Sequence, residues 1–393
     1  MKAPVKQSAA MGGQPIEQKR KRPSILILSG EQPTAAPRQY DRSSSDNGHW
    51  FVIYVVIATT LLVVVMLLGV TIGSVPIPFS AILRAVAEGI APHRFLLAKN
   101  VPNPTFTVVW WLRLPRVVMA ALVGAALGVA GAQMQGLFQN PLASPDIIGV
   151  SSGGALGGVI ALSTGLATRS MFYLPILSFG GSLLALAIVY AIATRRAQTA
   201  VVTLLLGGVA LNALIGAITS FLITVTWVRY EVSQQILFWL MGGLANRTWA
   251  HVWLGVPGII VGLAVSVAYS RDLDILASGE EVASSLGVDV QRTKRILLID
   301  AALLTGTAVA LSGAIAFAGL VVPHAVRLMI GPAHKRLLPA SALGGAIFLV
   351  FADILARTLD RPEEIQVGII TAFFGAPFFL YLLMRRNDAG FQQ

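Results

Sequence analysis

Two carboxylates, Asp300 and Asp353, lie well inside apolar runs of this sequence, where acidic residues are unusual. An ionisable group at membrane depth is costly, so it usually has a function, such as carrying a proton. A carboxylate near the end of an apolar run can instead contact a lipid headgroup or a partner helix. A proton relay and a structural contact are therefore both open for these two residues.

The residues needed for thiol chemistry, metal binding or nucleotide binding are either missing from this sequence or do not occur at the required spacing. The sequence has no cysteine, which excludes disulfides, thiolate metal sites and a cysteine nucleophile. Its histidines show no ligand spacing, so we predict no metal site and no catalytic residue. No G-x-x-x-x-G-K-[ST] loop occurs, and the chain should bind no ATP of its own. Any energy for work must come from a separate subunit or from an ion gradient.

The composition is that of a membrane protein. Hydrophobic residues make up 55% of the 393 residues and charged residues only 12%, with a formal net charge of +11. These values lie far outside the range of soluble domains. The basic excess accompanies long apolar runs, so it indicates orientation and headgroup contact, and no nucleic-acid partner. We predict an all-α, polytopic protein in the lipid bilayer.

About ten apolar runs could cross the membrane, because about 20 helical residues span its hydrocarbon layer. The predicted spans are Phe51–Val70, Val117–Phe138, a run that restarts after Asn140-Pro141, Ser170–Thr194, Val201–Trp227, Trp249–Tyr269, Thr293–Leu311, Gly313–Ile330, Leu337–Ala356 and Val367–Met384. An even number of spans places both termini on one side. Basic residues cluster at residues 19–22, so that side should be the cytoplasm.

The segments outside the spans predict the domain organisation. Residues 1–50 are polar and basic and should form a disordered cytoplasmic tail. Residues 51–386 should form the transmembrane domain, and residues 387–393 a short C-terminal tail. Residues 71–112 hold five prolines and predict a periplasmic loop, with a short amphipathic helix after Pro78 and interfacial anchors at the tryptophan pair 110–111.

A polar segment, residues 271–292, separates the sixth and seventh spans. Its sequence, RDLDILASGEEVASSLGVDVQR, predicts two short helices around a turn at residues 278–279. Glu280 and Glu281 would then lie in the first turn of the second helix, where acidic residues suit the helix dipole. The alternative is an ordinary solvated loop.

The stretch 113–158 organises the rest of the chain. It begins RLPR, with Arg113 and Arg116 on either side of a proline, and its first helix ends at Asn140-Pro141 because proline cannot continue a helix. The next helix repeats glycine every four residues, at Gly149, Gly153 and Gly157, which lets another backbone approach closely.

These motifs resemble the permease family of binding-protein-dependent ABC importers for iron-siderophores, haem and vitamin B12. The carrying elements are RLPR, GAxxQGLFQNPLAxPDIIGVSSG and, far downstream, FAGLVVPHAVRL, which occur in the family's order. The resemblance covers about residues 51–386. It implies the fold of the vitamin B12 permease, with two halves related as inverted repeats and two copies forming a homodimer.

The resemblance also implies roles for individual residues. The outer arginines Arg113, Arg116 and Arg357 would receive glutamates of a periplasmic binding protein, although headgroup contact is the simpler alternative. The segment 271–292 would be the coupling helices that dock on two ATP-binding cassette subunits. The contacts there would be Gly279, Glu280, Ala283, Leu286 and Gly287.

Two further sets of residues would form the passage. The cytoplasmic gate implied by the resemblance consists of Asn140 and Leu142 at one turn and Ala200 and Val201 at another. Amides within spans could line the path or simply join helices, and these amides are Gln133, Gln135 and Asn212.

The function implied is import of an iron(III)-siderophore complex across a bacterial inner membrane, with ATP hydrolysed on the partner subunit. Haem and vitamin B12 are alternative cargoes, because their permeases share these motifs. A proton-coupled secondary transporter is the rival function, and it needs a titrating carboxylate in the path. The sequence departs from the family at Gln366, where a proline is usual, which leaves the direction of the last span undetermined.

Overall fold

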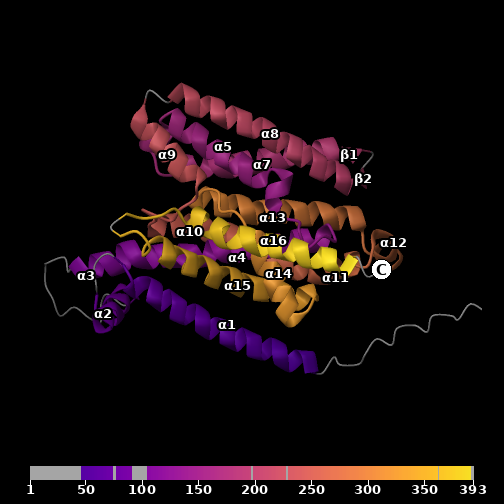
Figure 1. Cartoon of the computed structure of the whole chain (residues 1–393), viewed down its shortest axis with the longest axis horizontal. Coiled ribbons are helices and arrows are strands. Elements are labelled where there is room, and N and C mark those ends of the chain that lie inside the picture. The colour runs from indigo at the N-terminus through magenta and orange to yellow at the C-terminus, as the bar shows by residue number, and fades with distance from the viewer. Residues whose placement is uncertain are drawn as a thin grey trace, which may run out of the picture. The chain divides into compact units, whose positions relative to one another are not determined.

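The computed structural model of the chain describes residues 46–73, 77–90, 104–195, 198–226, 229–361 and 363–390. The tail expected at residues 1–50 lies almost entirely outside the described residues. The described residues are helical apart from turns, loops and a small hairpin (Figure 1). That hairpin pairs β1 (Thr194–Arg195) with β2 (Gln198–Thr199) in antiparallel register. The predicted all-α class is confirmed.

Ten helices correspond to the ten predicted spans within the described residues. Seven are long and apolar enough to cross a membrane, and three apolar helices are shorter. The long ones are α1 (Asp46–Thr71), α4 (Leu114–Leu137), α7 (Tyr173–Ala193), α8 (Val201–Thr226), α10 (Trp249–Ala268), α13 (Val290–Ser312) and α15 (His334–Ala356). The others are α5 (Val150–Ser163), α14 (Ala318–Ile330) and α16 (Val367–Gly390). Because α16 continues to Gly390, the C-terminal tail begins later than the predicted residue 387.

Short elements join these helices. They are α2 (Phe79–Ile90), α3 (Pro104–Phe106), the π-helix η1 (Thr107–Arg113), the 3-10 helix η2 (Pro145–Ile148), α6 (Leu166–Arg169), α9 (Tyr230–Leu240), α11 (Ser270–Leu276) and α12 (Glu280–Ser285). The amphipathic helix expected after Pro78 is α2. We did not predict α9 from the sequence.

The predicted loop 71–112 is wrong in its last part, because residues 104–113 are helical and run directly into α4. Pro104 is the first residue of this helix, a position at which proline is tolerated since no intrahelical N–H bond is lost there. Trp110 packs against Trp249, with ring centroids 5.3 Å apart, and its carbonyl accepts a 2.8 Å hydrogen bond from the Trp249 indole. Trp110 therefore joins two helices, whereas Trp111 is exposed.

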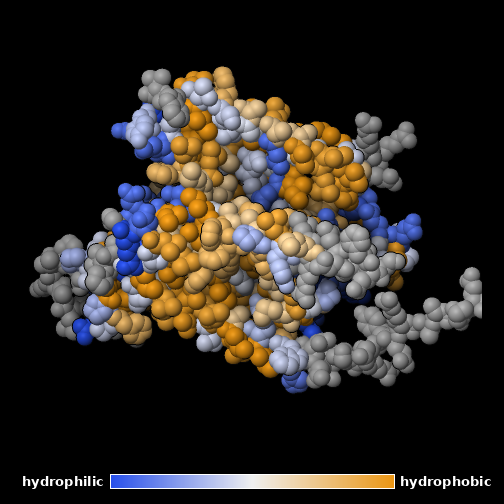
Figure 2. All heavy atoms as spheres, in the orientation of Figure 1, coloured by the Kyte–Doolittle hydropathy of each residue, from blue (hydrophilic) through white to orange (hydrophobic). Residues whose placement is uncertain are grey.

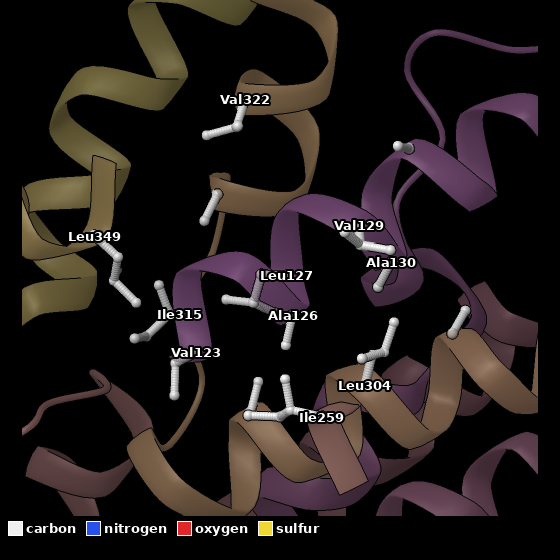
Figure 3. Close-up of a cluster of buried hydrophobic side chains, with 14 of the residues drawn as sticks. Val123, Ala126, Leu127, Val129, Ala130, Ile259, Leu304, Ile315, Val322 and Leu349 are labelled. Carbon is white, nitrogen blue, oxygen red and sulfur yellow. The ribbon is translucent and has the colours of Figure 1, made fainter. Parts of the chain in front are cut away.

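The helix α4 is the centre of the core. It packs against α10, α13, α14 and α15. Figure 3 shows Val123, Leu127 and Val129 of α4 among side chains from those neighbours, including Leu304 and Leu349. All of these side chains are apolar, and this core holds the helices around α4.

Two close helix contacts depend on glycine. A Cβ atom on Gly124 would lie 2.1 Å from the Gly345 carbonyl oxygen, and one on Gly157 would lie 2.0 Å from that of Leu177. These contacts join α4 to α15 and α5 to α7. The predicted bare face on α5 is therefore confirmed at Gly153 and Gly157. Gly149 is different, because it precedes the helix in a left-handed conformation with φ of 90°.

Polar residues gather at the two ends of the face shown in Figure 2, and hydrophobic residues cover the helices between them. At one end lie α2 and α3, and at the other lie α11, α12 and the β1–β2 hairpin (Figure 1). This distribution suits helices that cross a bilayer.

Candidate functional site

Two of the predicted docking arginines hold the end of α1. The guanidinium groups of Arg113 and Arg357 donate hydrogen bonds of 2.9–3.2 Å to backbone carbonyls of residues 69–72. The last carbonyls of a helix have no partner within it, so these bonds satisfy them. Both arginines are buried, each 7% exposed.

Asp353 lies at the centre of the same cluster. Its carboxylate is 2.9 Å from Nε of Arg116 and 3.0 Å from Nη2 of Arg357, and its side chain is fully buried. Arg116 also pairs with Glu364 at 2.8 Å, and the Glu364 side chain is 43% exposed. The sequence placed Asp353 inside a span, but the structure makes it the shared counter-ion of two arginines.

A cavity of about 310 Å³ opens beside this cluster. Its lining includes Glu364 and five arginines, which are Arg113, Arg116, Arg247, Arg357 and Arg361. We call it the arginine cavity. Desolvation lowers the pKa of the half-buried Arg247 guanidinium to about 10.

The arginine cavity can receive acidic groups, because its guanidinium groups outnumber its carboxylates. Sequence reasoning missed Arg247 and Arg361. A usable signal existed, since each flanks an apolar run on the side where Arg113 and Arg357 lie. The docking role of Arg113, Arg116 and Arg357 stays a prediction.

The segment 271–292 folds as the sequence predicted. Two short helices, α11 and α12, meet at a turn, and Gly279 has a φ of 115° that favours glycine. Val282 and Leu286 are 45% and 65% exposed on this polar end of the molecule. Exposed apolar side chains on a polar segment are typical of a contact with another protein.

Ala283 differs from the prediction. Its side chain is fully buried in the main hydrophobic core, so it supports α12 and cannot contact a partner. Glu280 is exposed, and its carboxylate pairs with Lys294 of α13 at 2.5 Å. Val282 is an exposed apolar side chain of α12 that the sequence analysis did not single out, because the pattern alone did not show which side of α12 faces inward.

Two contacts join α11 to the spans. His334, the first residue of α15, donates from its backbone N–H to the Asp274 carboxylate at 2.7 Å, and its ring Nδ1 lies 2.7 Å from the same oxygen. Burial alone would raise the pKa of Asp274, but the His334 bonds and charge outweigh it and hold that pKa below 3.8. The second contact is a 2.8 Å bond from Gln139 Nε2 to the Leu276 carbonyl.

The predicted gate residues lie in two separate turns. Asn140 closes the first turn, because its Oδ1 accepts a 3.0 Å bond from the Leu142 N–H. Ala200 and Val201 follow the β1–β2 hairpin, and Ala200 is exposed. Residues of this second turn, together with Glu280 and Gln291, line a cavity of about 760 Å³.

The three amides expected along a path do not share one site. Gln133 is fully buried and donates to Ser266 at 2.7 Å and to Asp300 at 2.5 Å. Gln135 donates to the carbonyl of Leu320 at 3.0 Å. These two glutamines therefore join α4 to α10, α13 and α14, which is the alternative that the sequence left open. Their place in a path stays a prediction.

Asn212 is half-buried on α8. Its Nδ2 donates to the carbonyls of Asp146 and Ile147 in η2 at 3.0 and 3.3 Å. The departure at Gln366 does not displace the start of α16, which begins at the next residue. The N–H of Gly368 bonds to the Gly242 carbonyl at 3.3 Å, which fixes the start of this helix.

Comparisons with known proteins agree with this architecture. Residues 61–385 match the FecCD transport family. The cobalamin import system permease protein of Halobacterium salinarum is 48% identical over 311 residues, covering 79% of this chain and 80% of that protein. The Fe(3+) dicitrate transport system permease protein of Escherichia coli is 40% identical over 319 residues, with coverages of 81% and 94%. A solved metal-chelate type ABC transporter in an inward-facing conformation gives a TM-score of 0.71 at 30% identity, covering 84% of this chain and 97% of that chain.

The fold and both polar ends define a multi-pass membrane permease. The chain belongs to the FecCD transport family. Its resemblance to the permeases of ABC importers for iron chelates, haem and vitamin B12 is confirmed.

Proposed function

We propose that this chain is the permease of an ABC importer that moves an iron(III)-siderophore complex into the cytoplasm. ATP would be hydrolysed on two separate ATP-binding cassette subunits, and this chain would bind no cofactor. The carrying observation is the segment 271–292, which presents exposed apolar side chains at a polar end and is hydrogen-bonded next to both predicted gate turns, through Leu276 and Gln291. Such a segment can transmit force that the chain does not generate.

The ATPase contact would consist of Gly279, Glu280, Leu286 and Gly287, with Val282 in place of the buried Ala283. Gly279 and Gly287 both have positive φ and open space around them, so a partner surface can approach their backbone. Leu286 would be the central apolar contact, since it is the more exposed of the two apolar side chains and removing apolar surface from water favours association.

At the opposite end, the arginine cavity would receive carboxylates of a periplasmic substrate-binding protein. Arg247 and Arg361 extend the set formed by Arg113, Arg116 and Arg357. Because Arg116 and Arg357 already share Asp353, the cavity would hold its arginines in fixed positions before the partner arrives. Fixed, charge-assisted pairs set the orientation and the rate of docking.

The passage would lie between two copies of this chain, lined by α8 and α16. Both helices keep large apolar side chains exposed in the single chain, such as Leu206 and Phe221 on α8 and Phe373 on α16. Asn212 would supply a polar group on this path, and residues 140–142 and 200–201 would close it at the cytoplasmic end. For Gln133 and Gln135 we propose the interhelical role instead.

Both termini would lie in the cytoplasm, with the protein in the inner (plasma) membrane. Iron-siderophore complexes are the first choice of cargo, and haem and vitamin B12 are the alternatives that the relatives' names include. Proton-coupled transport is disfavoured, because Asp353 is paired with two arginines and Asp300 is enclosed by Gln133 and Ser266.

The test is uptake of labelled ferric siderophores, haem and cobalamin by proteoliposomes that contain the chain with its ATPase subunit and binding protein. ATP-dependent uptake of a ferric siderophore is expected. Uptake of haem or cobalamin alone would change the cargo and keep the importer. Failure of all three would refute the proposal.

The ATPase contact is tested in the same complex by Leu286→Asp, which should prevent co-purification of the ATPase subunit. Leu359→Asp is the matched control, because Leu359 is 61% exposed but lies beyond α15 at the other end. Equal ATPase binding by both variants would refute the contact.

A further inference from the structure

Two glutamine side chains connect the segment 271–292 to the two predicted gate turns. Gln139 Nε2 donates to the Leu276 carbonyl at 2.8 Å, and Gln291 Oε1 accepts from the Thr199 N–H at 3.0 Å. Leu276 and Gln291 lie near the two ends of the segment. Each gate turn is therefore bonded to a different part of it.

Gln139 is directly followed by the gate residue Asn140. Its backbone has a φ of 49°, and its N–H bonds to the Gly136 carbonyl at 3.2 Å, so the turn itself fixes where its side chain begins. The carbonyl it reaches belongs to the last residue of α11, and carbonyls at a helix C-terminus have no partner within the helix. A movement of α11 thus pulls on a bond that is attached to the first gate turn.

Gln291 lies in the first turn of α13, directly after the segment's second helix. Its Oε1 atom accepts the hydrogen bond from the N–H of Thr199. Thr199 is a buried residue of β2 that immediately precedes Ala200. The neighbouring bond from Arg295 Nε to the Tyr190 hydroxyl, at 3.0 Å, joins the same helix to the end of α7 before the hairpin. The hairpin is therefore attached to α13 on both of its sides.

The direction of each bond is fixed by its backbone partner. A carbonyl only accepts, so Gln139 must donate through its amide nitrogen, and a backbone N–H only donates, so Gln291 must accept through its amide oxygen. Glutamate has the same shape as glutamine but only accepts when ionised. Replacement by glutamate should break the first bond and keep the second.

We infer that Gln139 and Gln291 are positioning residues that make the two gate turns follow the segment 271–292. The inference rests on the proposed importer function. The hydrogen bond from Gln139 transmits motion to residues 140–142, and the one to Gln291 transmits it to residues 200–201. Neither residue touches cargo or nucleotide, and ATP hydrolysis on the partner continues when either bond is lost.

The absence of cysteine from the sequence allows a direct test. Leu142→Cys or Ala200→Cys gives one reactive thiol at one gate turn. The rate of maleimide labelling is measured in the complex with the ATPase subunit, with and without a non-hydrolysed ATP analogue. Each reporter should change its labelling rate on nucleotide binding by about fivefold or more, which corresponds to about 1 kcal/mol.

The glutamine variants are then combined with these reporters. Gln139→Glu should abolish the nucleotide response at Leu142→Cys and leave that at Ala200→Cys, and Gln291→Ala should do the reverse. Gln291→Glu should keep the response of Ala200→Cys, because its carboxylate still accepts. ATP hydrolysis should stay within about twofold in all three variants, since each loses at most one neutral hydrogen bond far from the nucleotide.

The inference is overturned if both responses survive the loss of the bonds, or if Gln291→Glu behaves like Gln291→Ala. A different result is expected if the importer function itself is wrong. In that case neither reporter responds to nucleotide in the chain with intact glutamines, and the proposed function falls together with this inference.

Discussion

Replacing Asp353 by asparagine tests how the end of the bundle near α1 is held. Asparagine keeps the shape of the side chain but removes the negative charge that lies 2.9 Å from Arg116 and 3.0 Å from Arg357. All three side chains are at most 11% exposed, so water can only partly replace the lost counter-ion. Arg116 keeps Glu364, whereas Arg357 keeps only backbone carbonyls among its described contacts.

Removing one partner of a buried ion pair typically costs about 3–5 kcal/mol, and we expect a loss of stability in this range. The assay is the free energy of unfolding in mixed micelles titrated with a denaturing detergent. Glu364→Gln is the matched control, because it removes a charge from the same arginine at a site that is 43% exposed. Its cost should be about 0–1 kcal/mol, as for exposed pairs.

The comparison of the two variants can refute this reasoning. If Asp353→Asn costs no more than Glu364→Gln, the buried carboxylate is not the counter-ion that holds Arg116 and Arg357. If Asp353→Asn is strongly destabilised, loss of uptake in that variant does not indicate proton coupling. Only Asp300 then remains informative for the rival transport mechanism.

Three further predictions concern other parts of the molecule. Asp300→Asn should keep uptake within about twofold, because an amide can still bond to Gln133 and Ser266; a proton carrier would lose uptake altogether. Gly157→Ala should lower the free energy of unfolding by about 1–3 kcal/mol, because its Cβ would lie 2.0 Å from a backbone oxygen, whereas Gly180→Ala on α7 meets nothing within 4 Å and should not destabilise. Asp274→Asn should lower the free energy of unfolding at pH 7 relative to the unchanged chain. The pKa of Asp274 in the folded chain lies below its usual value, so this difference is lost only as the pH falls through that folded pKa. A difference that disappears between pH 7 and pH 5 would contradict this.

Much of the fold could be predicted because the thickness of the bilayer sets the length of an apolar run that spans it. The ends of α7, α8 and α10 lie within three residues of their predicted bounds, whereas α1 begins five residues before its predicted start. Proline was a less certain guide, since Asn140-Pro141 ends a helix whereas Pro104 begins one. The difference lies in where the proline falls within the helix, which its presence in the sequence does not show.

The sites were predictable in location more than in detail. Segment 271–292 and its turn were visible in the alternation of polar and apolar residues. Which side of α12 faces inward depends on packing against α13, so Ala283 was assigned to the wrong surface. Arg247 is brought to the arginine cavity by the fold, because it is more than a hundred residues from both Arg116 and Arg357, whereas Arg361 follows Arg357 by four residues.

Gln133 illustrates a limit that is common to polar residues within spans. An amide in an apolar run could face a passage or another helix, and both arrangements satisfy its hydrogen bonds. The structure gives it Ser266 and Asp300 as partners, from two helices that are distant in sequence. Only the packing of α4 against α10 and α13 decides whether Gln133 faces a passage or another helix.

The most direct test of the account is the energy source of transport. Proteoliposomes with this chain, its ATPase subunit and the binding protein are given ATP inside or outside, with or without a protonophore, and chelate uptake is measured. We predict uptake that requires ATP on the side of segment 271–292 and is unchanged by the protonophore, while the isolated chain hydrolyses no ATP. Uptake that stops with the protonophore, or ATP hydrolysis by the isolated chain, would contradict the claim that this permease is driven through that segment.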